Sequence, residues 1–239
     1  SGHVRAGETL SAIGPNGAGK STLSACLSGA MRASEGAVTF SGTPISDLSA
    51  SALARRRAVL EQSPVGPANF RVCDLAELSV PIEIAPAAAE RACDAALAAV
   101  GLSDLRDRTL SALSGGERRR ALMARALAQL WSCRSIGEGR WLLLDEPTAN
   151  LDLAHQVSVA RAAKTAAANG AGVIAVLHDL SLAAQMSDRI AVLSDGVLRQ
   201  VGPPSEVLTT ELMASVYGVR ADVSASSAGA LQVTPLFLD

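Results

Sequence analysis

The chain has 239 residues, of which 49% are hydrophobic, and its formal net charge is -2. This length suits one globular domain with ample apolar material for a core. The 21 basic and 23 acidic residues leave no bulk attraction to phosphate backbones, and aromatic residues, at 3%, are too few to stack on bases, so we expect no nucleic-acid partner. No apolar run reaches the roughly 20 residues that span a bilayer, and residues 1–10 lack the apolar stretch of a signal peptide.

Four cysteines are scattered along the chain without any Cys-x-x-Cys pair: Cys26, Cys73, Cys93 and Cys133. This distribution favours a reduced, cytosolic protein over a disulfide framework or a zinc site.

The first predicted elements are a short strand over 10–13, a glycine-rich loop and a helix. The loop fits the pattern G-x-x-x-x-G-K-[ST] from Gly14 to Ser21, in the strand–loop–helix context that this phosphate-binding motif requires. We expect Lys20, one of only two lysines, to bind the β- and γ-phosphates of ATP, and Ser21 to ligate Mg²⁺. The predicted ATP-binding residues are Gly14, Pro15, Asn16, Gly17, Ala18, Gly19, Lys20, Ser21 and Thr22.

Strands are predicted next at 36–42 and 55–62, the latter ending at Gln62, and helices follow at 72–80 and 86–102. In the second of these helices, Pro86 marks the start and Gly101 the end. Two short arginine runs, 55–57 and 118–120, are interpreted as solvated faces rather than nucleic-acid patches.

A further helix is predicted to begin at Ser114, with Gly115 and Gly116 in its first turn. A serine N-cap followed by glycines leaves free N–H groups and a hydroxyl, which together suit an anion. From these residues alone two interpretations stay open. One is an ordinary capped helix, and the other is a second phosphate cradle that serves the nucleotide of another copy of the chain.

An apolar strand over 141–144 then ends at Asp145 and Glu146, at the edge where ligands of open α/β sheets bind. One carboxylate is expected to hold the water shell of Mg²⁺, and the other to polarise an attacking water. The remaining elements are a helix over 154–170, a buried parallel strand over 171–179, a hairpin turning on Asp195 and Gly196, and a strand near the end of the chain.

Taken in order, these motifs resemble those of the ATP-binding subunits of ABC transporters over nearly the whole chain. "GPNGAGKST" matches the Walker A loop, "LSGGE" the signature and "LLLDEP" Walker B, while "LEQSP", "ANLD" and "VLHDL" match the Q-loop, D-loop and switch. The resemblance implies an α/β fold, namely a P-loop NTPase, RecA-like core of the ABC ATPase type with an inserted helical subdomain. The implied division is core over 1–62 and 136–218, helical subdomain with the signature over 63–135, and tail over 219–239.

The resemblance also implies roles for particular residues. Glu146 would be the catalytic base, His178 would contact the γ-phosphate, and Gln62 would couple the metal site to the helical region. Asp152 would end the D-loop. The implied metal ligands are Ser21, Gln62 and Asp145, and the implied contacts to the partner's ATP are Ser114, Gly115, Gly116 and Glu117.

A single cassette without membrane spans resembles the ATPases of bacterial importers. "LDLAHQ" after Walker B, the segment "LWSCRSIGEGRW" and the later "EVLTTELMASVYGV" are most similar to those of haem-importer ATPases, within the group that imports iron chelates, vitamin B12 and haem. The implied assembly is a homodimer docked on a transmembrane permease dimer at the cytoplasmic face of the inner membrane, served indirectly by a periplasmic substrate-binding protein. The alternatives are a siderophore or vitamin B12 importer and an ABC ATPase acting on nucleic acid or ribosomes.

One feature departs from the family pattern. Family members usually carry an aromatic residue on two strands upstream of Walker A, where it stacks on adenine. No aromatic residue precedes Gly14 here, so no adenine-stacking residue is assigned.

Overall fold

A six-stranded sheet forms the centre of the computed structural model, which describes residues 2–61, 69–227 and 229–236. In spatial order, the strands are β4 (Arg57–Leu60), β5 (Trp141–Asp145), β6 (Gly172–Val176), β1 (Thr9–Ile13), β7 (Arg189–Ser194) and β8 (Val197–Gly202). The first five are parallel, and β8 pairs with β7 in the antiparallel sense. Their carboxyl ends therefore meet at one edge of the sheet, which is where the loop after β1 and the acidic pair after β5 were predicted to lie.

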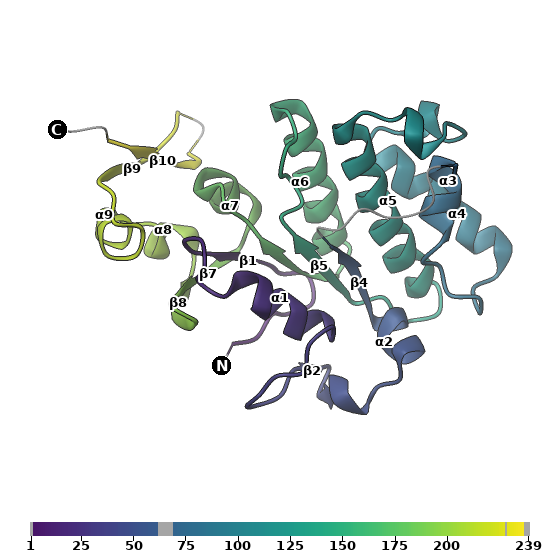
Figure 1. Ribbon diagram of the computed structural model, residues 1–239, viewed down its shortest axis with the longest axis horizontal. Helices are drawn as coiled ribbons and strands as arrows, with labels where there is room; N and C mark the ends of the chain where they lie inside the picture. Colours follow the sequence, from purple (N-terminus) through teal and green to yellow (C-terminus); the bar gives the residue numbers. More distant parts are fainter. Residues whose placement is uncertain (1, 62–68, 228, 237–239) are drawn as a thin grey trace.

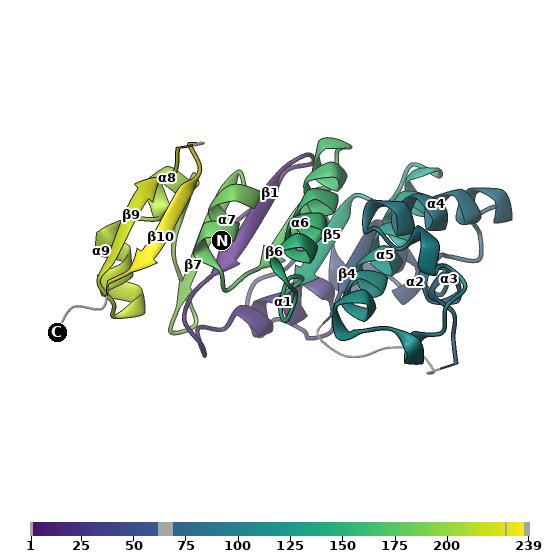
Figure 2. The ribbon, with the colours of Figure 1, turned by 90° about the horizontal axis from the view of Figure 1, so that it is seen from above.

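Helices cover both faces of this sheet, as Figures 1 and 2 show: α1 lies on one face, and α6 and α7 lie on the other. The α-helices are α1 (Lys20–Ser28), α2 (Ala50–Arg56), α3 (Val72–Glu77), α4 (Pro86–Ala99), α5 (Gly115–Arg134), α6 (Leu153–Ala168), α7 (Leu180–Met186), α8 (Pro204–Val207) and α9 (Thr210–Leu212). Short turns of 3₁₀-helix form η1 (Ile45–Asp47), η2 (Ser103–Leu105) and η3 (Leu110–Ala112), and η4 (Met213–Tyr217) is a turn of π-helix. Because both faces are covered, the inner strands β5 and β6 read as apolar runs without alternation, whereas the edge strand β8 is largely exposed.

Helices α3, α4 and α5 pack together at one end of the molecule, beyond β4 (Figure 2). Their contact is apolar: Leu75, Leu97, Met123 and Leu127 are almost completely buried. The predicted boundaries of α4 are confirmed, since Pro86 occupies its first turn and Gly101 follows with a φ of 67°.

The start of α5 is a reciprocal cap. The Ser114 hydroxyl accepts a hydrogen bond from the Glu117 N–H (3.2 Å), and the Glu117 carboxylate accepts one from the Ser114 N–H (2.7 Å). The predicted helix start at Ser114 is therefore confirmed. The prediction that the arginine run 118–120 is a solvated face is wrong for two of its residues, because Arg120 is buried and Arg119 is half-buried, with their guanidinium groups on backbone carbonyls.

Two small antiparallel pairs lie outside the central sheet. The strand predicted over 36–42 is only β2 (Thr39–Phe40), which pairs with β3 (Thr43–Pro44), and the strand near the end of the chain is β10 (Leu231–Pro235), paired with β9 (Ala221–Ala225). The predicted hairpin between β7 and β8 is confirmed: Asp195 and Gly196 have φ angles of 53° and 74°, the left-handed pair that a tight two-residue turn requires.

None of the helices in the described part of the chain is both long enough and apolar enough to cross a membrane.

Candidate active site

The glycine-rich loop connects β1 to α1 at the carboxyl edge of the sheet. Lys20, the first residue of α1, is buried, and its ammonium donates hydrogen bonds to the carbonyls of Gly14 (2.7 Å) and Pro15 (2.9 Å). Burial lowers the pKa of Lys20, and the charges of Glu146 and Asp145 oppose that effect. The lysine is therefore held at the loop and lies within electrostatic reach of the acidic pair after β5.

At Gly14, the first residue of the loop, there is room for backbone only. A Cβ on Gly14 would lie 2.1 Å from the carbonyl oxygen of Leu193, so no larger residue fits there without a shift of β7. Gly19, the N-cap of α1, has a φ of 95° and provides no side chain to cap the helix. Ser21 and Thr22 in the following turn are exposed. An uncapped helix start beside glycines presents N–H groups and hydroxyls that suit a phosphate.

Asp145 ends β5 and is half-buried. Burial raises the pKa of its carboxyl, while the Ser24 hydroxyl on α1 lowers it. Its Oδ1 atom is buried and has no hydrogen-bond partner among the described residues. A buried carboxylate oxygen without a partner costs free energy, and a bound cation would satisfy it.

Glu146 and His178 come together at the ends of the neighbouring strands β5 and β6. The imidazole Nε2 lies 2.6 Å from Glu146 Oε1, and the Glu146 N–H donates to the carbonyl of Val176 (3.1 Å). Glu146 has a φ of 47°, in the left-handed region that non-glycine residues rarely adopt. Such backbone outliers are concentrated at functional sites, where the surrounding contacts hold them in place.

Gln62 lies outside the described residues, so its predicted roles at the metal and in coupling stay predictions. Strand β4 ends at Leu60, two residues before it, at the same edge of the sheet as the other predicted groups.

The second predicted cradle lies at the N-terminus of α5. Ser114 and Gly115 are exposed, and an added Cβ on Gly115 would meet nothing within 4 Å. Gly116 lies against the D-loop side of α6, because its added Cβ would lie 3.7 Å from His155 Nδ1. Asp152 caps α6 by accepting a hydrogen bond from the His155 N–H (2.9 Å) and is itself exposed. The signature and the D-loop therefore form one exposed corner of the molecule.

Two residues near the site were missed at the level of sequence. Arg119 on α5 reaches the carbonyls of Asp145 and Glu146. Tyr217, the only tyrosine, has a buried hydroxyl near the Gly14 backbone, and burial raises its pKa to about 12. In the sequence, Arg119 stands out only as a member of an arginine run and Tyr217 only as the single tyrosine. Neither feature indicates that the residue contacts the site.

A phosphate loop after the central strand β1, a carboxylate pair after β5 and a histidine after β6 together define a P-loop ATPase. The family profile described as ABC transporter matches residues 1–149, and this chain belongs to that family. It is therefore an ABC ATPase, whose ATP hydrolysis is coupled to transport.

Curated relatives cover nearly the whole chain. A hemin import ATP-binding protein, HmuV, of Rhodopseudomonas palustris is 44% identical over 236 residues, which are 99% of this chain and 87% of that protein. The HmuV protein of Myxococcus xanthus is 44% identical over 220 residues, 91% of this chain and 82% of that one. Among solved structures, cbiO1 of Clostridium perfringens, part of an ABC transporter complex, superposes with a TM-score of 0.72 at 26% identity, covering 86% of this chain and 81% of that one.

Proposed function

We propose that this chain is the ATPase subunit of a haem importer. The observation that carries the proposal is the similarity to hemin import ATP-binding proteins, at 44% identity over 99% of the chain in one case. The ATPase subunit supplies the energy of transport, and the choice of cargo lies with the other subunits of such an importer.

In the proposed reaction, Glu146 accepts a proton from the attacking water. A bond forms between the water oxygen and the γ-phosphorus, the bond to the β–γ bridging oxygen breaks, and ADP leaves with that electron pair. His178 orients the Glu146 carboxylate through the 2.6 Å hydrogen bond and contacts the γ-phosphate. Lys20 neutralises charge on the β- and γ-phosphates, and the remaining loop residues from Gly14 to Thr22 contribute N–H groups and hydroxyls.

Mg²⁺ fits the donors at this site. The unpartnered Oδ1 of Asp145 and the exposed Ser21 hydroxyl are oxygen donors of the kind that Mg²⁺ prefers, and Gln62 would complete the set. When bound, Mg²⁺ supplies positive charge to the phosphate oxygens.

Two copies of the chain would form the working unit. Ser114 and Gly115 are exposed, Gly116 and Glu117 beside them are half-exposed, and all four lie in the same corner as Asp152, while the chain already has a phosphate loop of its own. We infer that this corner binds the nucleotide held by the partner's Walker A loop, so that each of two sites takes one loop from each subunit.

The proposed division of the chain is a core over 1–62 and 136–218, a helical subdomain over 63–135 and a tail over 219–239. A groove at the edge of the helical part supports docking of a permease there. Residues of α2, α5 and the segment after α3 line it, and two of these, the large apolar side chains of Leu78 and Ile82, are 54% and 97% exposed. A short amphipathic helix of a permease's cytoplasmic loop would bury both.

This assembly would lie at the cytoplasmic face of the inner membrane. On the opposite, periplasmic side, a substrate-binding protein would deliver haem to the permease. The test is deletion of the gene, followed by growth on haem, a ferric siderophore or vitamin B12 as the limiting nutrient. Loss of growth on haem alone, restored by the wild-type gene, is expected. Loss confined to a siderophore or to vitamin B12 would assign the chain to that importer, and unchanged growth with DNA or ribosome association would replace the transport role.

The docking groove has its own test. Ile82→Asp should abolish co-purification with the permease while leaving ATP binding intact, because no residue of the phosphate loop lines this groove. The matched control is Leu236→Asp, at an exposed position next to β10 on the far side of the molecule, and it should leave co-purification unchanged.

A further inference from the structure

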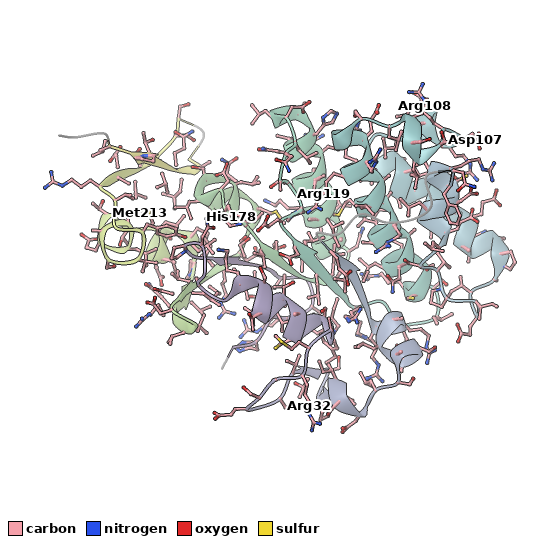
Figure 3. The ribbon with its side chains drawn as sticks, in the orientation of Figure 1. Arg32, Asp107, Arg108, Arg119, His178 and Met213 are labelled. Carbon is pink, nitrogen blue, oxygen red and sulfur yellow. The ribbon has the colours of Figure 1, made fainter. Side chains whose placement is uncertain are left out.

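Arg119 on α5 connects three backbone carbonyls that lie at the ends of two neighbouring strands. Its Nη2 donates to the carbonyl oxygens of Asp145 (2.8 Å) and Glu146, and its Nη1 donates to that of Glu61 (3.4 Å). Asp145 ends β5 and Glu146 follows it, and Glu61 follows β4, the strand beside it. Figure 3 labels Arg119 and His178, which reach this edge of the sheet from α5 and from the end of β6. One planar guanidinium therefore joins the signature helix to both strand ends.

The carbonyl of Glu146 belongs to a turn that needs such support. Its φ of 47° is a conformation that side chains other than glycine rarely adopt. Three further contacts hold the turn: the N–H of Glu146 donates to Val176, its carbonyl also accepts from the Ala149 N–H (3.2 Å), and its carboxylate meets His178. The hydrogen bond from Arg119, in contrast, comes from helix α5 and not from the strands or the loops that follow them.

The contacts of Arg119 are to backbone oxygens, so both side-chain carboxylates stay available for the reaction. Glu146 Oε1 bonds to His178, and Asp145 Oδ1 has no hydrogen-bond partner in the described part of the chain. Arg119 is half-buried; burial lowers its pKa, and the charges of Glu146 and Asp145 oppose this. A guanidinium stays charged in proteins, so the group adds a fixed positive charge behind the acidic pair.

We propose that Arg119 is a positioning residue that holds the left-handed turn at Glu146 and so couples the signature helix α5 to the catalytic carboxylate of its own chain. Because the N-terminus of α5 bears the cradle for the partner's nucleotide, a shift of α5 on closure would move the base directly. This inference rests on the proposed role of Glu146 as catalytic base.

The experiment compares Arg119→Met with Arg118→Met in the purified chain. Arg118 is the neighbouring residue of the same helix, and it donates one hydrogen bond to the Leu110 carbonyl (3.2 Å), away from the acidic pair. For Arg119→Met we expect kcat for ATP hydrolysis to fall by about 10-fold to 100-fold, the scale of lost charge-assisted hydrogen bonds, with KM and ATP affinity within about threefold of wild type. Arg118→Met should keep kcat within about twofold. Equal kcat values for the two variants would overturn the inference.

If Arg119→Met does not fold, Arg119→Lys tests whether Arg119 positions the turn at Glu146. A lysine can donate to one or two of the carbonyls but cannot span all three as the planar guanidinium does, so kcat should fall less than in Arg119→Met at unchanged ATP affinity. Wild-type kcat in Arg119→Lys, together with a misfolded Arg119→Met, would mean that Arg119 serves folding alone.

A double variant separates this inference from the proposed role of Glu146. If Arg119 acts through that carboxylate, Arg119→Met in a Glu146→Gln background should lower the residual hydrolysis by less than about twofold. A full, multiplicative loss would overturn the positioning role. Undiminished hydrolysis in Glu146→Gln alone would instead overturn the assignment of the base, which is a separate failure.

Discussion

His178 Nε2 and Glu146 Oε1 lie 2.6 Å apart, joining side chains from the ends of the neighbouring strands β6 and β5. The imidazole is exposed, whereas the carboxylate is half-buried, so the hydrogen bond connects a solvent-exposed side chain with a more buried one. A carboxylate fixed at one oxygen by a histidine keeps its other oxygen in a defined direction, which is the geometry that a general base needs toward a water.

The first prediction concerns that carboxylate. Glu146→Gln should retain ATP binding and lose hydrolysis by about 10²-fold or more, because an amide keeps the size of the side chain but cannot accept the water's proton. Steady-state phosphate release and equilibrium binding of ATP measure the two effects. The control is Glu90→Gln on the exposed surface of α4, which should match wild type. Undiminished turnover in Glu146→Gln would remove Glu146 as the base.

The two lysines of the chain provide a matched pair for the second prediction. Lys20→Ala should weaken ATP affinity by about tenfold or more, because it removes the ammonium that neutralises the phosphates in the bound state. Lys164, by contrast, is exposed on α6 and donates a hydrogen bond to the Gln185 carbonyl (3.1 Å). Lys164→Ala should therefore leave the affinity unchanged. Titration with a fluorescent ATP analogue measures both, and equal losses would mean that the loop is not the nucleotide site.

Asp145 yields a prediction in which stability and activity move in opposite directions. Burial raises the pKa of its carboxyl, so the folded chain binds this proton more tightly than the unfolded chain. The stability that the neutral form contributes is present below the unfolded pKa, about 4, and is lost as the pH rises through the higher folded pKa. At pH 7 without Mg²⁺ or nucleotide, the ionised Asp145 therefore lowers the free energy of unfolding.

Asp145→Asn should accordingly raise the urea midpoint at pH 7 while Mg²⁺-dependent ATP hydrolysis falls by about 10²-fold. Asp104→Asn, on the exposed surface of η2, is the control and should change neither. A lower midpoint for Asp145→Asn, combined with wild-type hydrolysis, would contradict both parts of the argument.

The parts of the site that could be predicted from the sequence are those whose geometry is local. The loop from Gly14 to Ser21 and the cap of Ser114 with Glu117 each involve contacts within a few residues, so residue type and spacing suffice. Gln62 is also a local prediction, but it lies outside the described residues. Its role stays a prediction.

The contacts that could not be predicted join residues far apart in the chain. Arg119 meets Glu61 across 58 positions and Asp145 across 26, and these pairs exist only because β4 and β5 are neighbours under α5. A run of three arginines carries no sign of which member turns inward. The structure shows how the three arginines are placed around α5: Arg120 is on the buried, apolar side of the helix, Arg118 is on the exposed side, and Arg119 lies between them.

The last prediction concerns the exposed cradle at the start of α5. Ser114→Arg would put a bulky cation where the helix N–H groups must meet the partner's γ-phosphate, while the loop from Gly14 to Ser21 is untouched. We expect ATP binding to persist and hydrolysis to fall to near background. Ser111→Arg, an exposed position of η3 three residues earlier, is the matched control and should keep wild-type hydrolysis.

A mixture of two defective chains gives the sharper test of shared sites. In a dimer of one Lys20→Ala chain and one Ser114→Arg chain, sites built from two subunits would gather both lesions in one site and leave the other intact. The mixed dimer should regain hydrolysis above that of either homodimer, up to about half the wild-type rate per mixed dimer when the two sites turn over independently. If each chain used its own two loops, every site would contain a lesion and mixing would restore nothing. Mixing would also restore no hydrolysis if hydrolysis strictly required two working sites. Labelled nucleotide distinguishes that case, because the one intact site of a mixed dimer built from shared sites would still close and trap a single ATP.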